Sequence, residues 1–94
     1  MKIKWLRRAL TNLDDLAAYI ARDNPKAAAS MVVRIMSVVE GLGSHPSLGR
    51  PGRVAGTREL VVSGTPFIVP YRVRDQTVEI ICVFHSARRW PDRF

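Results

Sequence analysis

A histidine near the carboxyl end of the chain stands close to several arginines, and these residue types together could act on a phosphodiester. Cleavage of RNA through its 2′-hydroxyl requires a base, an acid and cations that stabilise charge on the phosphate. His85 could supply the acid or base, while Arg72, Arg88 and Arg89 could supply the cations. No second convincing base stands near the glycine-rich loop, and a lone histidine at a strand end is more often structural or solvent-facing. The sequence therefore offers an incomplete ribonuclease site, with Arg72, His85 and Arg88 as its candidates.

Metal and cofactor chemistry find little support in the residue types present. Cys82 is the only cysteine, so no internal disulfide can form. It lies in the apolar run IICVF, which indicates a buried and inert thiol. One cysteine and two well-separated histidines make no zinc-ligand cluster. We expect neither a metal nor a cofactor.

The charge balance points to an acidic or polyanionic partner. The chain has 15 Lys and Arg residues against 8 Asp and Glu residues, a formal net charge of +7. This excess favours nucleic acid, an acidic protein or a nucleoprotein complex, without choosing among them. Every cation after Lys26 is an arginine, whose guanidinium group suits bidentate pairing with carboxylates or phosphates. The carboxyl-terminal half is therefore predicted to carry the contact surface.

Two segments of that half could grip a partner without any catalysis. The tail RRWPDRF combines arginines with aromatic side chains, and Arg and Trp often dominate binding energy. A glycine-rich loop carries further arginines, which are either held toward a partner or simply solvated. Trp90 either contacts the target or folds back onto the sheet as an anchor. The candidate target-binding residues are Arg50, Arg53, Arg88, Arg89, Trp90 and Arg93.

A plain nucleic-acid-binding module is a third possibility. The net charge permits it, but the sequence shows no helix-turn-helix pattern and no zinc finger. Aromatic residues make up only 7% of the chain, which argues against a sheet that stacks bases.

Two helices are predicted in the first half of the chain. Apolar residues recur at helical spacing over residues 9–22 and again over 26–42. Between them, Pro25 disfavours helical geometry at Asn24 and suits the first position of the second helix, which Asn24 can cap. So short a link predicts that the two helices pack as an antiparallel hairpin.

Short strands are predicted on either side of the helices. The segment KIKWL alternates as a first strand would, and a loop rich in Gly and Pro follows the helices. Beyond that loop, RELVV, FIVPYRV and TVEIICVFH predict an antiparallel meander over residues 58–62, 67–73 and 77–85. Pro70 cannot donate a ladder hydrogen bond, so it marks an edge or a bulge. Tyr71 is predicted to face the core, and Arg58 and Glu59 to pair at the surface.

The order of these elements, β-α-α-β-β-β, predicts an α+β fold. A two-helix antiparallel hairpin would pack on one face of a small, mainly antiparallel sheet. The length fits a single domain over residues 1–94. No apolar run is long enough to span a bilayer, and the N-terminus lacks the features of a signal peptide. We therefore expect a cytoplasmic protein that does not associate with membranes.

Four segments of the chain, in order, resemble the ParE-type toxins of the RelE/ParE superfamily. They are AAYIARDNPKAA, HPSLGRPGRVAGTRELVV, PFIVPYRV and VEIICVFHSARRWP, and they cover nearly the whole chain. The resemblance implies the toxin of a type II toxin–antitoxin system, neutralised by tight binding of a cognate antitoxin. ParE-type toxins are associated with inhibition of DNA gyrase, whereas RelE-type relatives cut messenger RNA on the ribosome. One scaffold hosts both activities, so the fold alone does not separate them.

For this chain the resemblance favours gyrase as the target. Arg72 matches a sheet position where RelE-type relatives carry arginine, but His85 is only near their acid–base position, and no tyrosine follows Tyr71. A gyrase inhibitor needs no catalytic residues, only a surface that grips a protein–DNA complex. We therefore expect a non-catalytic gyrase inhibitor that meets DNA only indirectly, through gyrase or the antitoxin. A ribosome-dependent mRNA endoribonuclease is the alternative.

Overall fold

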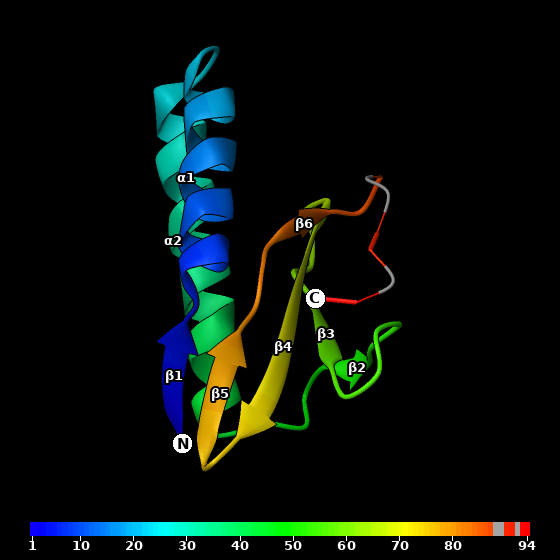
Figure 1. The fold of residues 1–94 in the computed structure, drawn as a ribbon. Coiled ribbons are helices and arrows are strands. Elements are labelled where there is room, and N and C mark those ends of the chain that lie inside the picture. The colour runs from blue at the N-terminus through cyan, green and yellow to red at the C-terminus, as the bar shows by residue number, and fades with distance from the viewer. Residues whose placement is uncertain (88–89, 92) are drawn as a thin grey trace.

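The computed structural model describes residues 1–87, 90, 91, 93 and 94, and its elements follow the predicted order (Figure 1). They are β1 (Lys2–Trp5), α1 (Arg7–Ala21), α2 (Pro25–Glu40), the 3-10 helix η1 (Gly41–Gly43), β2 (Arg50–Pro51), β3 (Arg58–Val61), β4 (Phe67–Arg74), β5 (Thr77–Ile80) and β6 (Phe84–His85). The two helices pack on one face of a mostly antiparallel, six-stranded open sheet. The predicted α+β fold is confirmed.

β4 is the central strand of the sheet. The strand order is β1-β5-β4-β3-β2, and β6 pairs with the first residues of β4. β3, β4 and β5 form the predicted antiparallel meander, whereas β1 runs parallel to β5 at one edge. β2 lies inside the glycine-rich loop and was not predicted. It has only two residues, which pair with Arg58 and Glu59 at the other edge of the sheet.

The helical hairpin is closed by the link that the sequence predicts. The Asn24 side chain accepts a hydrogen bond from the Ala27 N–H at 3.0 Å, and Pro25 occupies the first helical position. The α1 helix begins two residues earlier than predicted, since its first turn is already closed by the bond from Leu10 N–H to Leu6 C=O. No helix among the described residues combines the length and apolar character that a membrane crossing needs.

The core lies between this hairpin and the sheet. Ile35 and Val39 of α2 pack there with the inward-facing side chains of β4 and β5. Tyr71 is fully buried, so its predicted core position is confirmed. Its hydroxyl donates to the Pro46 C=O and accepts from the Gly49 N–H, both at 2.8 Å. These two bonds tie the start of the glycine-rich loop to the core.

The predicted strand over residues 77–85 is interrupted by a bulge. β5 ends where Ile80 pairs with Tyr71, and β6 resumes where Phe84 pairs with Ile68. Three residues, 81–83, therefore stand opposite only two on β4, one of which is Pro70. Pro70 accepts from the Ile81 N–H at 3.0 Å but has no N–H to return. Pro70 thus marks a bulge as predicted, while the edge alternative is wrong because β4 has neighbours on both sides.

The extra residue reverses which face the following side chains occupy. In an uninterrupted strand, alternation would put His85 on the same face as Glu79. Beyond the bulge, however, Val83 packs into the core, Phe84 points to the open face, and His85 pairs with core-facing Phe67. The bulge therefore moves His85 to the helix side of the sheet.

Candidate target-binding surface

A buried carboxylate organises the open face of the sheet near β2. The Glu59 side chain is only 3% exposed, and it accepts hydrogen bonds from both loop arginines. Arg50 donates Nε and Nη2 to Oε1 at 3.2 and 3.0 Å. Arg53 donates its backbone N–H and Nε to Oε2 at 2.8 and 3.1 Å, and Nη2 to Oε1 at 3.3 Å. Burial by itself raises the pKa of Glu59, but these hydrogen bonds outweigh it and hold the pKa below the ordinary value.

The predicted surface pair of Arg58 with Glu59 is wrong. Adjacent residues of a strand point to opposite faces, so these two side chains cannot meet. Arg58 instead donates Nη1 to the Gly49 C=O at 2.8 Å, on the other side of the strand. Glu59 pairs with Arg50 and Arg53 instead of Arg58, and the side chains of these two arginines remain 52% and 45% exposed. Both loop arginines are therefore fixed in position and still accessible to a partner.

The tail packs back onto this surface. The Trp90 ring lies under the Arg53 guanidinium, whose central carbon is 3.7 Å from the centroid of the ring. The centroids of the Trp90 and Phe84 rings are 4.7 Å apart. Phe94 stacks on Phe84 at 6.2 Å, so the chain ends beside the sheet (Figure 1). Arg8, at the start of α1, lies 5.7 Å from both phenylalanine centroids. Trp90 is thus placed as an anchor, and its Nε1 is buried without a partner among the described residues.

We call this arrangement the cation–aromatic cluster: Arg8, Arg53, Phe84, Trp90 and Phe94. Sequence reasoning missed Arg8 and Phe84, because Arg8 lies on a helix far from the tail in sequence and because the bulge decides the direction of Phe84. Of the other predicted contact residues, Arg93 is exposed. Arg88 and Arg89 lie outside the described residues.

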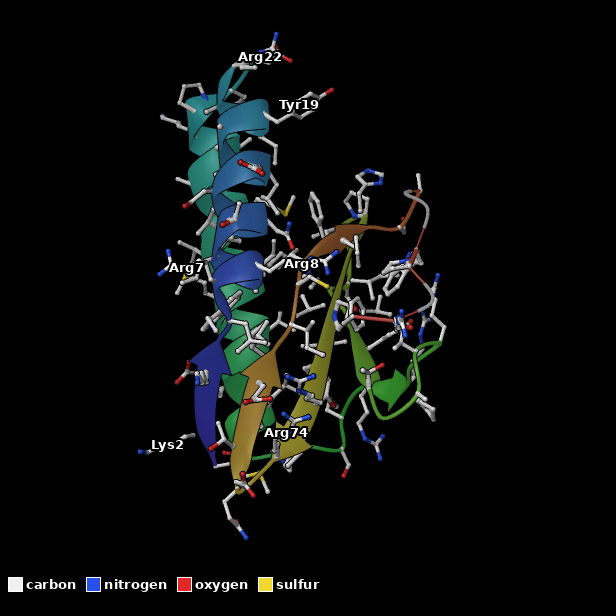
Figure 2. All side chains as sticks on the ribbon, viewed as in Figure 1. Lys2, Arg7, Arg8, Tyr19, Arg22 and Arg74 are labelled. Carbon is white, nitrogen blue, oxygen red and sulfur yellow. The ribbon has the colours of Figure 1, made fainter. Side chains whose placement is uncertain are left out.

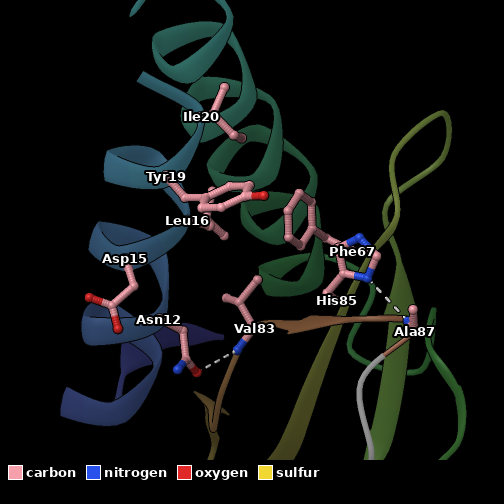
Figure 3. A pocket seen from close by; sticks show the side chains of 9 residues that line it. All are labelled: Asn12, Asp15, Leu16, Tyr19, Ile20, Phe67, Val83, His85 and Ala87. Carbon is pink, nitrogen blue, oxygen red and sulfur yellow. Dashed lines mark hydrogen bonds between the residues drawn. The ribbon is translucent and has the colours of Figure 1, made fainter. Parts of the chain in front are cut away.

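The candidate ribonuclease residues do not come together. Arg72 is half-buried on the open face, where its Nε donates to Glu79 Oε1 at 2.7 Å. This hydrogen bond is the main cause that holds the pKa of Glu79 below the ordinary value. His85 lies on the helix side, edge-on to Phe67 at 5.6 Å, and its Nδ1 accepts from the Ala87 N–H at 3.1 Å (Figure 3). The body of the sheet separates the two, and Arg88 is outside the described residues.

His85 lines a cleft of about 520 Å³ between α1 and β6 (Figure 3). Apolar side chains of α1, of β4 and of the residues that flank β6 line it, together with the polar groups of Asn12, Asp15 and Tyr19. The Asn12 side chain accepts from the Val83 N–H at 3.0 Å, which ties α1 to the bulge. Tyr19 is 72% exposed. The cleft thus combines apolar side chains with polar groups from α1 and with His85.

The lone thiol is buried, as predicted. Burial raises the pKa of Cys82 to about 12, so the thiolate is disfavoured at neutral pH. In the part of the chain that the structure describes, no three His, Cys, Asp or Glu side chains group as metal ligands would.

Comparison with known proteins identifies the family. The family model described as ParE toxin of the type II toxin–antitoxin system parDE matches residues 3–90. The chain belongs to this ParE toxin family. As a ParE-family chain, it is a type II toxin of the wider RelE/ParE superfamily, as the sequence resemblance implied.

Relatives of this ParE-family chain carry names from both branches. Y4kP of Sinorhizobium fredii, named as a candidate toxin, is 48% identical over 90 residues, covering 96% of this chain and 93% of the relative. Toxin RelE2 of Caulobacter vibrioides is 36% identical over 87 residues, covering 93% of this chain and 97% of the relative.

Solved structures share the ParE-family fold. The chromosomal ParDE toxin–antitoxin system from P. aeruginosa contains a chain that is 31% identical with a TM-score of 0.81, covering 90% of this chain and 95% of that one. The toxin–antitoxin complex RelBE2 from Mycobacterium tuberculosis contains a chain with a TM-score of 0.59 at 22% identity. The match covers 93% of this chain and 92% of that one. At that identity the second match supports the fold alone.

Proposed function

We propose that this ParE-family toxin inhibits DNA gyrase without catalysis and is neutralised by a cognate antitoxin. The observation that carries the proposal is the placement of Arg72 and His85 on opposite faces of the sheet. Acid–base cleavage of RNA needs its acid, base and cations around one phosphate. A non-catalytic inhibitor needs only a rigid surface, which the Glu59-bound arginines and the tail supply.

The antitoxin is the proposed occupant of the cleft between α1 and β6. The ParDE structure, which contains a 31% identical chain, is a toxin–antitoxin system. In this chain the cleft combines an apolar lining with the exposed ring of Tyr19, a combination suited to an amphipathic partner segment. We also propose that residues 1–94 form a single domain and that the toxin acts in the cytoplasm, where gyrase works.

A ribosome-dependent mRNA endoribonuclease is the second candidate. The name of the 36% identical relative, Toxin RelE2, favours it. It would require an acid–base residue other than His85 beside Arg72, because His85 faces the helices.

The deciding experiment compares the two targets directly. Purified toxin should inhibit gyrase supercoiling and leave messenger RNA on translating ribosomes uncut. Arg93→Ala, which removes an exposed cation of the tail, should weaken gyrase inhibition. His85→Ala should leave inhibition unchanged, since that ring lies in the cleft on the other face. Ribosome-dependent RNA cleavage that His85→Ala abolishes, with normal gyrase activity, would replace this proposal by the second candidate.

A further inference from the structure

Cations form two parallel rows across the open face of the sheet. The register of β1, β5 and β4 aligns Lys4, Glu79 and Arg72 in one row. The neighbouring row consists of Lys2, Thr77 and Arg74. Neighbouring strands lie about 4.8 Å apart, and residues two apart in one strand about 7 Å, so the rows cover a compact area.

The single carboxylate in these rows does not neutralise them. Glu79 is surrounded by Arg72, Arg74 and Lys4, and all three cations hold its pKa below the ordinary value. Arg72 is its hydrogen-bond partner, whereas Lys4 and Arg74 are exposed. Figure 2 shows Arg74 on the sheet and Lys2 extending from the edge of β1.

The positive surface continues beyond the rows. Arg8 lies over Phe84 and Phe94 on the same face, and Arg50 and Arg53 lie beside β3. Among the described residues, the glutamates of this face, Glu59 and Glu79, are each already bound to arginine. A ligand with many negative charges is therefore needed to complement the whole face.

The chemistry of the face favours the backbone of duplex DNA over other polyanions. Within the described residues, the two rows contain only charged side chains and one threonine, so they lack the apolar anchor that a protein interface requires. The aromatic rings of the same face form one cluster, because Trp90 and Phe94 each pack on Phe84 and Arg53 lies over Trp90, which leaves fewer ring faces to stack bases of a single strand. Contacts to a repeating phosphate backbone need neither anchor nor stacking.

We infer that the open face of the sheet, centred on Lys4, Arg72 and Arg74, binds the phosphate backbone of duplex DNA without reading its sequence. This inference goes beyond the sequence-based expectation that the toxin contacts DNA only through gyrase or the antitoxin. The inference deepens the proposed function, on which its biological setting rests, since gyrase holds duplex DNA that the toxin could contact. DNA binding itself is measurable without gyrase, so the two proposals can fail separately.

The test is fluorescence anisotropy of a labelled 20-base-pair duplex titrated with purified toxin at several salt concentrations. Lys4→Ala/Arg74→Ala should raise Kd about tenfold or more and reduce the slope of log K against log salt by about 2, as expected for two lost phosphate contacts. The matched control is Arg22→Ala/Lys26→Ala, which removes the same charge at the tip of the hairpin, far from Arg74 (Figure 2). The control should bind DNA almost as the unaltered protein does.

Three outcomes would overturn the inference. The first is an equal loss of affinity for duplex DNA in the two double variants. The second is tighter binding of single-stranded RNA than of duplex DNA, and the third is tighter binding of poly-glutamate than of duplex DNA. Thermal unfolding of both variants ensures that a loss reflects the surface and not the fold. Duplex binding that survives a failed gyrase assay would leave this inference standing alone.

Discussion

At the residue scale, Glu59 holds two arginines of the candidate surface in place, although its own side chain is buried. Its buried carboxylate holds Arg50 and Arg53, and Arg53 in turn covers Trp90. A partner would therefore meet side chains that are already ordered, and ordered side chains lose less entropy on binding.

Glu59→Ala should lower the free energy of unfolding by about 1.5–3 kcal/mol, because it removes the charged hydrogen bonds that hold two half-exposed arginines. The pKa of Glu59 is lowered in the folded protein, so its contribution is complete above the ordinary carboxyl range and is lost as pH falls through the lowered pKa. Chemical denaturation at pH 7 and near pH 3 measures both effects. Glu79→Ala, with one arginine partner and more exposure, is the control and should cost less. A Glu59→Ala protein as stable as the unaltered one at pH 7 would contradict this role.

At the element scale, the helices were easier to predict than the last strands. Helical spacing and the Asn24-Pro25 link are local signals, and both helices appear within two residues of their predicted bounds. The bulge after Ile80 depends on pairing with Pro70 across the sheet, so alternation within one strand could not reveal it. Pairing between strands also explains why the candidate site was predicted only in part. Arg50 and Arg53 could be named from sequence, but the carboxylate that they share, Glu59, was assigned to the wrong partner.

Asn24→Ala should lower the free energy of unfolding by about 1 kcal/mol, since the Ala27 N–H at the start of α2 loses its acceptor. Asn24→Asp keeps an oxygen in place and should restore most of the stability. Urea denaturation of the three proteins checks the cap. Equal stability of Asn24→Ala and the unaltered protein would show that water replaces the side chain at no cost.

At the scale of the whole molecule, the chain exposes large apolar side chains on its helical hairpin. Tyr19 on α1 and Val33 on α2 are 72% and 66% exposed. If the antitoxin occupies the cleft, Tyr19→Arg should weaken the co-purified complex by tenfold or more, because about 1.4 kcal/mol of lost contact corresponds to tenfold in affinity. Val33→Arg, which lies outside the residues that line the cleft, should leave the complex intact. Isothermal titration calorimetry distinguishes the two, and an equal loss in both variants would place the antitoxin elsewhere.

The bulge at residues 81–83 also limits what an alignment can transfer between relatives. A relative with the same number of residues here but no bulge would present the residue aligned with His85 on the open face, because its strand would pair one position further along β4. Two proteins could then share an identical histidine in one alignment column while placing it in two unrelated environments. The way in which the segment between Ile80 and Phe84 pairs with β4, more than the identity of His85, therefore decides whether a residue role can be carried from one member of the superfamily to another.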